Sequence, residues 1–320
     1  MKNAEKREYI IDTYSGVAGK VLIQETNEQY KPLIIFNYFM PAYFINDQVA
    51  GFDWENIIDD YEHYYELFPL MDNKNISDVS MTLLKQGFYI HSYLDHYYIS
   101  KSDKYMKRHF LHDCATVIDF DLEKRVFYIA DNFKAGKFSV EEIKFVEYEN
   151  ALKNVKDGIM EYFWMEKDIK FRLRKNDIAE MIKAYLQGKG YKFESEYVVI
   201  RKKQGVLLGI DMYNVLLNEC EKMKKYNCNY QDYRSFQIMC NHMSIGYELI
   251  EYMKKNRILK ANSANMYKLL KRNMLMLRNM FIKVGVNKNE KSLDKLKKHI
   301  EEISVQEKNL LKQVLKVIKG

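Results

Sequence analysis

Residues 112–132 read HDCATVIDFDLEKRVFYIADN, and they contain two runs of apolar and β-branched residues separated by the three residues LEK. Each run, 115–121 and 125–131, suits a β-strand, and a short connection between such runs indicates a β-hairpin. The start of the first strand of a hairpin lies beside the end of the second. The sequence therefore predicts that His112 and Asp131 meet.

A carboxylate beside an imidazole can have a catalytic use. It fixes the tautomer of the ring and stabilises the imidazolium, which makes the pair the base and the orienting group of a catalytic triad. A His and an Asp at the ends of a hairpin are nevertheless more often structural than catalytic. The pair indicates an enzyme only together with a nucleophile.

The rest of the first half predicts helices followed by antiparallel strands. Residues 13–25 have a helical pattern, and 52–70 resemble a helix with an apolar stripe. The run 31–39 fits either a strand or a buried helix. Residues 88–99 are aromatic and β-branched, as in a strand, and 136–145 read as a short strand or turn leading into a helix.

Beyond about residue 165 the pattern is helical. Residues 211–226 have an Asp at their start and apolar residues at helical spacing, and the C-terminal stretch is amphipathic with many i,i+4 acid–base pairs. We therefore expect an α+β fold with two domains, residues 1–150 and an α-helical domain of residues 151–320.

Composition excludes several classes of protein. The 320 residues are 47% hydrophobic and 14% aromatic, which does not fit a disordered chain. No apolar run approaches 18 residues, so we expect no membrane span, and the charged N-terminus does not fit a signal peptide. The four cysteines form no CxxC pair. These features predict a cytoplasmic protein.

Charge is unevenly distributed along the chain. Residues 1–160 contain 18 basic and 26 acidic residues, and residues 161–320 contain 33 basic and 18 acidic ones. The basic half could attract nucleic acid, a phosphate-bearing cofactor or an acidic protein, although a lysine-rich solvated surface fits equally well. Glycine-rich phosphate motifs and nucleic-acid recognition motifs are absent, so we expect no nucleic-acid partner.

Several stretches together resemble one known family. They are TYSGVAGKVL (13–22), GFYIHSYLDHYYIS (87–100), KYMKRHFLHDCATVIDFDLEKRVFYIADN (104–132) and GKFSVEEI (136–143). Here the chain is similar to the butirosin-biosynthesis protein H family, whose N-terminal domain is papain-like and related to bacteriocin leader peptidases. The second half resembles the helical C-terminal region of that family more weakly.

The resemblance implies a papain-like fold, an N-terminal helix plus an antiparallel sheet, followed by an α-helical domain. His109, His112 and Asp131 fall on the H-x-x-H segment and the strand-ending Asp of the family, and Thr13 falls on its cysteine. The family pattern implies a Cys–His–Asp triad, so the catalytic residues implied here are Thr13, His112 and Asp131.

The function that the resemblance implies is acyl transfer from a carrier-protein thioester to an amine in antibiotic or peptide natural-product biosynthesis. The implied partners are an acyl or peptidyl carrier protein, whose phosphopantetheine arm carries the acyl group, and a small amine acceptor. No cofactor bound directly to this chain is expected. Two alternatives are a catalytically inactive binding or accessory protein and a leader-type peptidase.

Thr13 leaves three interpretations open. It could be a substituted nucleophile, which needs His112 to remove its proton during attack because a hydroxyl has a far higher pKa than a thiol. The chain could instead be a binder that retains the pocket. In the third interpretation His112 deprotonates the amine, which attacks the bound thioester directly.

Four further residues are candidates for substrate binding, each with a structural alternative. Ser15 lies near Thr13, although such a Ser more often caps a helix, and Thr13 itself could be that cap. His109 could orient substrate or merely line a loop. Asn132 could bind an acyl oxygen or a turn, and Tyr97 could line a cleft or the core.

Other reactive side chains are weaker candidates for catalysis or metal binding. Cys114 lies two residues from His112 and is expected to share its strand face, and a buried structural role is the better interpretation. On a regular strand His91 and Asp95 share a face while His96 points away. We therefore expect no metal site.

Overall fold

The computed structural model of the chain describes residues 8–54, 57–67, 76–155, 160–194, 197–230, 232–259 and 263–319. The chain divides into two compact units. Unit 1 comprises residues 1–29 and 59–169, and unit 2 comprises residues 30–58 and 170–320. The boundary expected near residue 150 thus lies within unit 1. Among the described helices, none combines the length and the apolar composition needed to cross a membrane.

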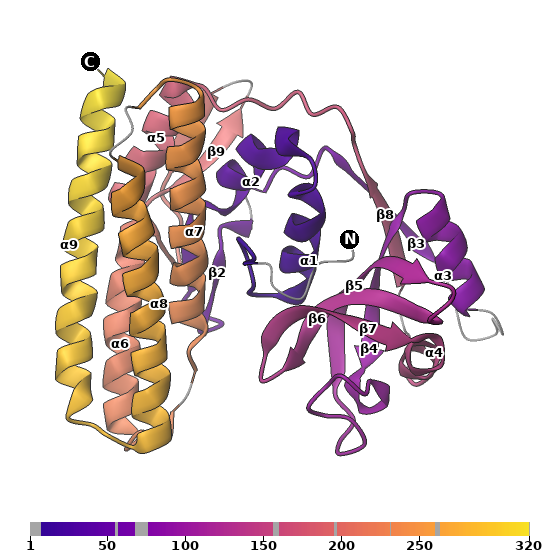
Figure 1. The fold of residues 1–320 in the computed structure, drawn as a ribbon. Coiled ribbons are helices and arrows are strands. Elements are labelled where there is room, and N and C mark those ends of the chain that lie inside the picture. The colour runs from indigo at the N-terminus through magenta and orange to yellow at the C-terminus, as the bar shows by residue number, and fades with distance from the viewer. Residues whose placement is uncertain are drawn as a thin grey trace. The chain divides into compact units, whose positions relative to one another are not determined.

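Unit 1 is built on one antiparallel sheet of six strands in the order β3–β8–β4–β5–β6–β7 (Figure 1). The strands are β3 (Glu62–Leu67), β4 (Tyr89–Asp95), β5 (Leu111–Asp121), β6 (Val126–Lys134), β7 (Lys137–Lys144) and β8 (Met160–Met165). The hairpin predicted from the sequence is confirmed as β5 and β6, in which Val117 lies opposite Ile129.

The first helix, α1 (Ser15–Gln24), packs on β5 and β6. Two glycines allow the close approach. A Cβ added to Gly19 would lie 2.1 Å from Oγ1 of Thr116, and one added to Gly16 would lie 2.7 Å from Cβ of Cys114. The small residues of α1 therefore set its distance from β5.

Two further helices, α3 (Ile76–Lys85) and α4 (Phe145–Lys153), cover the other face of the sheet. Ala115 and Val117 alternate with the residues that face α1, and they enter the main hydrophobic core of this unit together with Tyr148 of α4. The sheet is thus covered on both faces, with α1 on β5 and β6 and with α3 and α4 both on β4.

The prediction of a helix over residues 52–70 is wrong for the part that is described, which includes strand β3; residues 55–56 and 68–70 lie outside the described residues. On β3 the ring of Tyr65 stacks on Tyr162 of β8, with centroids 5.2 Å apart. Aromatic pairs across neighbouring strands stabilise a sheet, and this pairing outweighs the helical spacing of the apolar residues.

Unit 2 contains short strands and long helices. Its elements are α2 (Lys31–Tyr38), β1 (Pro41–Phe44), β2 (Val49–Phe52), α5 (Lys175–Leu186), β9 (Gly190–Glu194), β10 (Tyr197–Arg201), β11 (Val206–Leu208), α6 (Met212–Lys225), α7 (Arg234–Lys255), α8 (Ser263–Asn287) and α9 (Ser292–Lys319). The strands form a sheet in the order β11–β1–β2 and a β9–β10 hairpin. Short 3₁₀ turns are also present among the described residues: η2 (Glu28–Tyr30), η5 (His96–Tyr98) and η6 (Gly209–Asp211).

The sequence expectations for this region are met in part. The run 31–39 is largely the buried helix α2, with Pro32 in the first turn, where its missing N–H costs nothing. Residues 212–319 are predominantly helical, as expected. Residues 151–320 are not helical throughout, because they also contain β8, β9, β10 and β11.

A buried carboxylate joins the helices of unit 2. Glu307 of α9 accepts hydrogen bonds from Tyr185, Tyr213 and Tyr267 at 2.6, 2.8 and 3.0 Å, and Nε2 of His242 lies 2.8 Å from its Oε1. Burial raises the pKa of Glu307, but His242 and the tyrosine hydroxyls outweigh it, so the pKa lies below its ordinary value. The carboxylate is therefore ionised and fully hydrogen-bonded within the core.

Candidate active site

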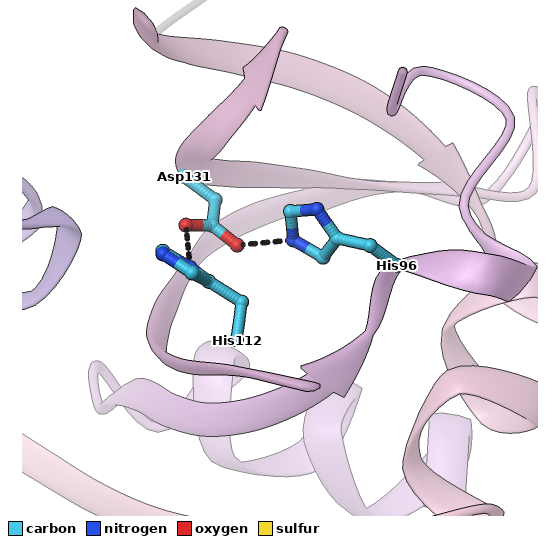
Figure 2. Close-up of side chains that lie close together, drawn as sticks. All are labelled: His96, His112 and Asp131. Carbon is cyan, nitrogen blue, oxygen red and sulfur yellow. Dashed lines mark hydrogen bonds and ion pairs between the residues drawn. The ribbon is translucent and has the colours of Figure 1, made fainter. Parts of the chain in front are cut away.

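The hairpin brings His112 and Asp131 together, and Figure 2 shows the carboxylate between two imidazoles. Nδ1 of His112 lies 2.7 Å from Oδ1 of Asp131. The carboxylate lies off the line of the ring N–H, so the contact has the length of an ion pair without the angle of a regular hydrogen bond. Because Nδ1 faces the carboxylate, Nε2 is the nitrogen left to take a proton.

The Asp131 carboxylate is completely buried and has three neighbours that can donate to it. Besides His112, the backbone N–H of Asn132 donates to Oδ1 at 2.7 Å, and Nε2 of His96 lies 2.9 Å from Oδ2. Burial raises the pKa of Asp131, but the two imidazoles lower it by a larger amount, so the net pKa is below the ordinary value. Asp131 is therefore an anion at neutral pH.

His112 has the opposite shift. Burial lowers the pKa of His112, while the Asp131 carboxylate and, more weakly, Asp113 raise it by more, so the net pKa is above its ordinary value. The side chain remains 21% exposed. It can therefore reach a bound substrate, and the raised pKa favours transfer of a proton from that substrate to the imidazole, as a general base requires.

A bulge in β5 separates His112 from Cys114. Two residues, Asp113 and Cys114, oppose the single residue Tyr93 of β4, and Cys114 has a φ of 58°. Simple alternation does not hold across such a bulge, which re-aims the side chains that flank it. The expectation that Cys114 shares the strand face of His112 is therefore wrong, and Cys114 instead contacts Gly16 of α1.

The start of α1 lies beside this bulge. Oγ of Ser15 donates a hydrogen bond to the backbone carbonyl of Asp113 at 3.2 Å. Tyr14 precedes the helix with φ 58° and ψ 101°, a conformation that costs free energy for a non-glycine residue. Thr13 is buried directly before it. The implied nucleophile position is thus next to a strained turn that contacts the strand carrying His112.

The predicted capping of α1 is not observed. Tyr14 occupies the N-cap position, and its side chain makes no capping hydrogen bond. Ser15 lies inside the first turn, where its hydroxyl binds Asp113 instead. Neither Thr13 nor Ser15 therefore occupies the N-cap position, and the hydroxyl of Ser15 attaches the helix to β5.

His109 and Tyr97 lie together but belong to a second pair. Nδ1 of His109 is 2.6 Å from Oδ2 of Asp95, and its ring stacks on Tyr97 with centroids 4.3 Å apart. Burial raises the pKa of Asp95, but His109 and two backbone N–H groups lower it by more. The imidazole of His109 is largely exposed, so it can contact a ligand from the surface.

Asn132 contributes through its backbone. Its side-chain Nδ2 donates to the carbonyl of Gly136 at 2.7 Å, which holds the β6–β7 turn. Its backbone N–H donates to Asp131. The side chain is therefore engaged as the structural alternative suggested.

His96 is a member of the cluster that sequence reasoning missed. It begins the 3₁₀ turn η5 rather than continuing β4, and its Nε2 faces Asp131. The available signal was Asp95, whose carboxylate accepts from the N–H of Tyr97 and caps this turn. An Asp before a turn ends the strand, so the alternation rule no longer placed His96.

His96, His112 and Asp131 also offer three possible metal-ligand atoms, all within 4.8 Å of one another. The Asp131 carboxylate contacts both imidazoles directly, at 2.7 Å from Nδ1 of His112 and 2.9 Å from Nε2 of His96. Ligands around a tetrahedral zinc ion are held roughly 3.3 Å apart by metal–nitrogen bonds of about 2 Å. The spacing suits a hydrogen-bonded acid–base cluster better than a ligand set, and the expectation of no metal stays a prediction.

Comparison of the chain with models of known protein families gives no match, and comparison with curated proteins gives none either. Function is therefore inferred from His112, Asp131 and their surroundings.

Proposed function

We propose that unit 1 is a papain-like domain and that the chain transfers an acyl group from a carrier-protein thioester to an amine in antibiotic or peptide natural-product biosynthesis. The observation that carries the proposal is the buried Asp131 beside His112, two residues from the Cys114 contact with α1. A helix start, a strand with His and a strand with Asp occur in the order that the butirosin-biosynthesis protein H resemblance implies.

His112 acts as the general base in this reaction. Its Nε2 removes a proton from the attacking group while that group bonds to the acyl carbon, and Asp131 stabilises the imidazolium formed. The carbon–sulfur bond of the thioester then breaks. The imidazolium returns the proton to the departing thiolate of the phosphopantetheine arm, so the base is regenerated.

Two nucleophiles are consistent with this role. Thr13 could attack first through its hydroxyl and form an ester that the amine then cleaves. Alternatively the amine attacks the thioester directly. Cys114 is not a competitor, because burial, with Asp113 adding to it, raises the pKa of its thiol to about 11, and the thiol stays protonated at neutral pH. With Thr13 at the implied nucleophile position and Cys114 protonated, neither side chain supplies a thiolate, and this favours direct attack by the amine.

The same lack of a thiolate favours the second candidate, a binding or accessory protein. Such a protein retains the fold of the domain and a ligand pocket without turnover. A peptidase of the leader-processing type is the weaker alternative, since peptide bonds are less reactive than thioesters and demand a stronger nucleophile.

Unit 2 offers a surface suited to a carrier protein. Helix α8 contains Lys and Arg residues and no acidic residue. Leu275 and Met276 are exposed on it, and Arg272 and Lys283 lie with them around one shallow depression of the surface. Apolar side chains rimmed by cations complement an acidic partner with an apolar centre.

Amide formation tests the proposal directly. The protein and its His112→Ala variant would be incubated with a panel of acyl thioesters on a carrier protein and with primary amines. We expect amide product from the unaltered chain and a loss of at least about 10³-fold in the variant. Ligand binding without product in both proteins would establish the binding module instead.

A further inference from the structure

We propose that His96 and Ser102 are positioning residues for His112: they hold the Asp131 carboxylate in one orientation and thereby keep the proton of neutral His112 on Nδ1. Their value for catalysis rests on the proposed function, whereas the proton arrangement itself is a property of the protein alone.

The hydrogen bonds around Ser102 define one direction of donation. The backbone N–H of Lys104 donates to Oγ of Ser102 at 3.1 Å, and the same Oγ lies 3.1 Å from Nδ1 of His96. No other acceptor for the Ser102 hydroxyl proton occurs among the described residues. The oxygen has a second lone pair, but if it also accepted from His96 the hydroxyl proton would have no acceptor among the described residues. Donation of that proton to Nδ1 satisfies both groups, and it assigns Nδ1 as the unprotonated ring nitrogen of His96.

The other side of the His96 ring follows from this assignment. With Nδ1 as an acceptor, the proton of neutral His96 is on Nε2, and it is donated to Oδ2 of Asp131 at 2.9 Å. His96 is 1% exposed, and its ring stacks on Phe133 with centroids 5.4 Å apart. The ring can neither rotate freely nor exchange its partners for water.

Asp131 needs this support because His112 alone does not orient it. The contact from His112 lacks a regular hydrogen-bond angle, while the contacts from His96 and the Asn132 N–H have it. These two groups therefore set the plane of the carboxylate. With the plane fixed, Oδ1 faces Nδ1 of His112 and favours a proton there, which leaves Nε2 as the base.

Imidazole nitrogen NMR on the ¹⁵N-labelled full chain tests the assignment without any substrate. At a pH where both rings are neutral, we expect His96 in the Nε2–H tautomer and His112 in the Nδ1–H tautomer. In His96→Leu the His112 signals should shift toward a mixture of tautomers. His96→Gln should restore them, because the glutamine amide can place an N–H near the position of Nε2.

His91→Leu is the matched control, since His91 is also a buried imidazole of this sheet but contacts Tyr64 and Phe163 rather than Asp131. It should leave His112 unchanged. Ser102→Ala is a milder second variant, and it should give His96 a mixture of tautomers.

Two results would overturn the proposal. One is His96 as the Nδ1–H tautomer in the unaltered chain. The other is a variant that folds but has no effect: His96→Leu with an unchanged His112 tautomer, or Ser102→Ala in which the tautomers of both His96 and His112 are unchanged. A failure of acyl transfer would leave these spectra as expected, so the two proposals fail separately.

Discussion

The protonation states of Asp131 and His112 depend on each other and on burial. Asp131 has no exposure, and an isolated carboxylate there would be protonated; its neighbours keep it charged. That charge in turn raises the pKa of His112 against the effect of burial. A substitution of Asp131 that removes its charge but keeps its shape therefore separates the effect of burial on the pKa of His112 from the effect of the Asp131 charge.

Asp131→Asn should lower the pKa of His112 below the ordinary value of about 6.5, because burial is then opposed only by the weaker effect of Asp113. Acyl transfer should fall by roughly 10³- to 10⁴-fold. An NMR titration of His112 in both proteins measures the shift. A His112 pKa that stays above its ordinary value in Asp131→Asn would show that Asp131 is not its source.

The same variant has a defined pH dependence of stability. The folded-state pKa of Asp131 is lowered, so its stabilisation is present above the unfolded value of about 3.9 and is lost as pH falls. The pKa of His112 is raised, so its stabilisation is present below about 6.5 and is lost as pH rises. The Tm difference between the two proteins should be largest between about pH 4 and 6.5.

Sequence reasoning found this pair but missed the residues behind it. His112 and Asp131 follow from hairpin geometry, which fixes neighbours from local order alone. His96 lies 35 residues from Asp131, and its contact depends on the turn that Asp95 caps. Alternation rules describe regular strands and fail where a strand ends or bulges.

At the scale of elements, the position of the candidate site depends on how closely α1 approaches β5. Gly19 lies within the helix, where an alanine would by itself favour helix formation by about 1 kcal/mol. The contact with β5 opposes that gain, because a Cβ there would lie 2.1 Å from Oγ1 of Thr116. Packing against Thr116 and helix propensity therefore predict changes of opposite sign in the free energy of unfolding when Gly19 is replaced by alanine.

Gly19→Ala should destabilise the protein by about 1–3 kcal/mol, as overpacked cores do. Chemical denaturation followed by circular dichroism gives the value. Ala18→Gly, at the adjacent buried position of α1, is a control that lowers helix propensity without adding atoms. Stabilisation by Gly19→Ala would mean that the helix does not press against Thr116.

The elements that the sequence predicted well are those with consistent local patterns. The β5–β6 hairpin, for example, has two strand-like runs and a short turn. The prediction for strand β3 was wrong because its alternating aromatic residues were interpreted as a helical pattern. Its partner β8 is about one hundred residues distant, so the cross-strand stacking was not visible in the local sequence.

At the scale of the whole molecule, the chain divides into two compact units, and we expect each to respond separately to damage. Glu307→Gln removes the charge that three tyrosines and His242 share in unit 2. We expect a loss of about 3–5 kcal/mol, the usual result of breaking a buried ion pair.

Hydrogen exchange measured by mass spectrometry locates that loss. Protection should fall in α5, α7 and α9, while β5 and β6 keep theirs. Glu301→Gln, on the exposed part of α9, should change neither unit. Equal loss of protection in β5 and β6 would show that the units unfold together.

The basic surface of α8 predicts a dependence on the acyl donor. Arg272→Glu combined with Lys283→Glu should lower kcat/KM for a carrier-bound thioester about tenfold, because rim charges steer association with an acidic partner. The rate with a small free thioester should be unchanged. Equal effects on both donors, or none, would remove α8 from the carrier interface.

The central claim is that this site performs acyl chemistry through His112, and intact-protein mass spectrometry on Thr13→Cys tests it most directly. With acyl thioesters, this variant should gain the mass of one acyl group. Direct attack by the amine predicts no adduct on the unaltered chain, whose Cys114 thiol is protonated at neutral pH. The adduct should also be absent from Thr13→Cys combined with His112→Ala. A Thr13→Cys variant that binds thioesters but never gains the acyl mass, together with no product from the unaltered chain, would contradict the claim.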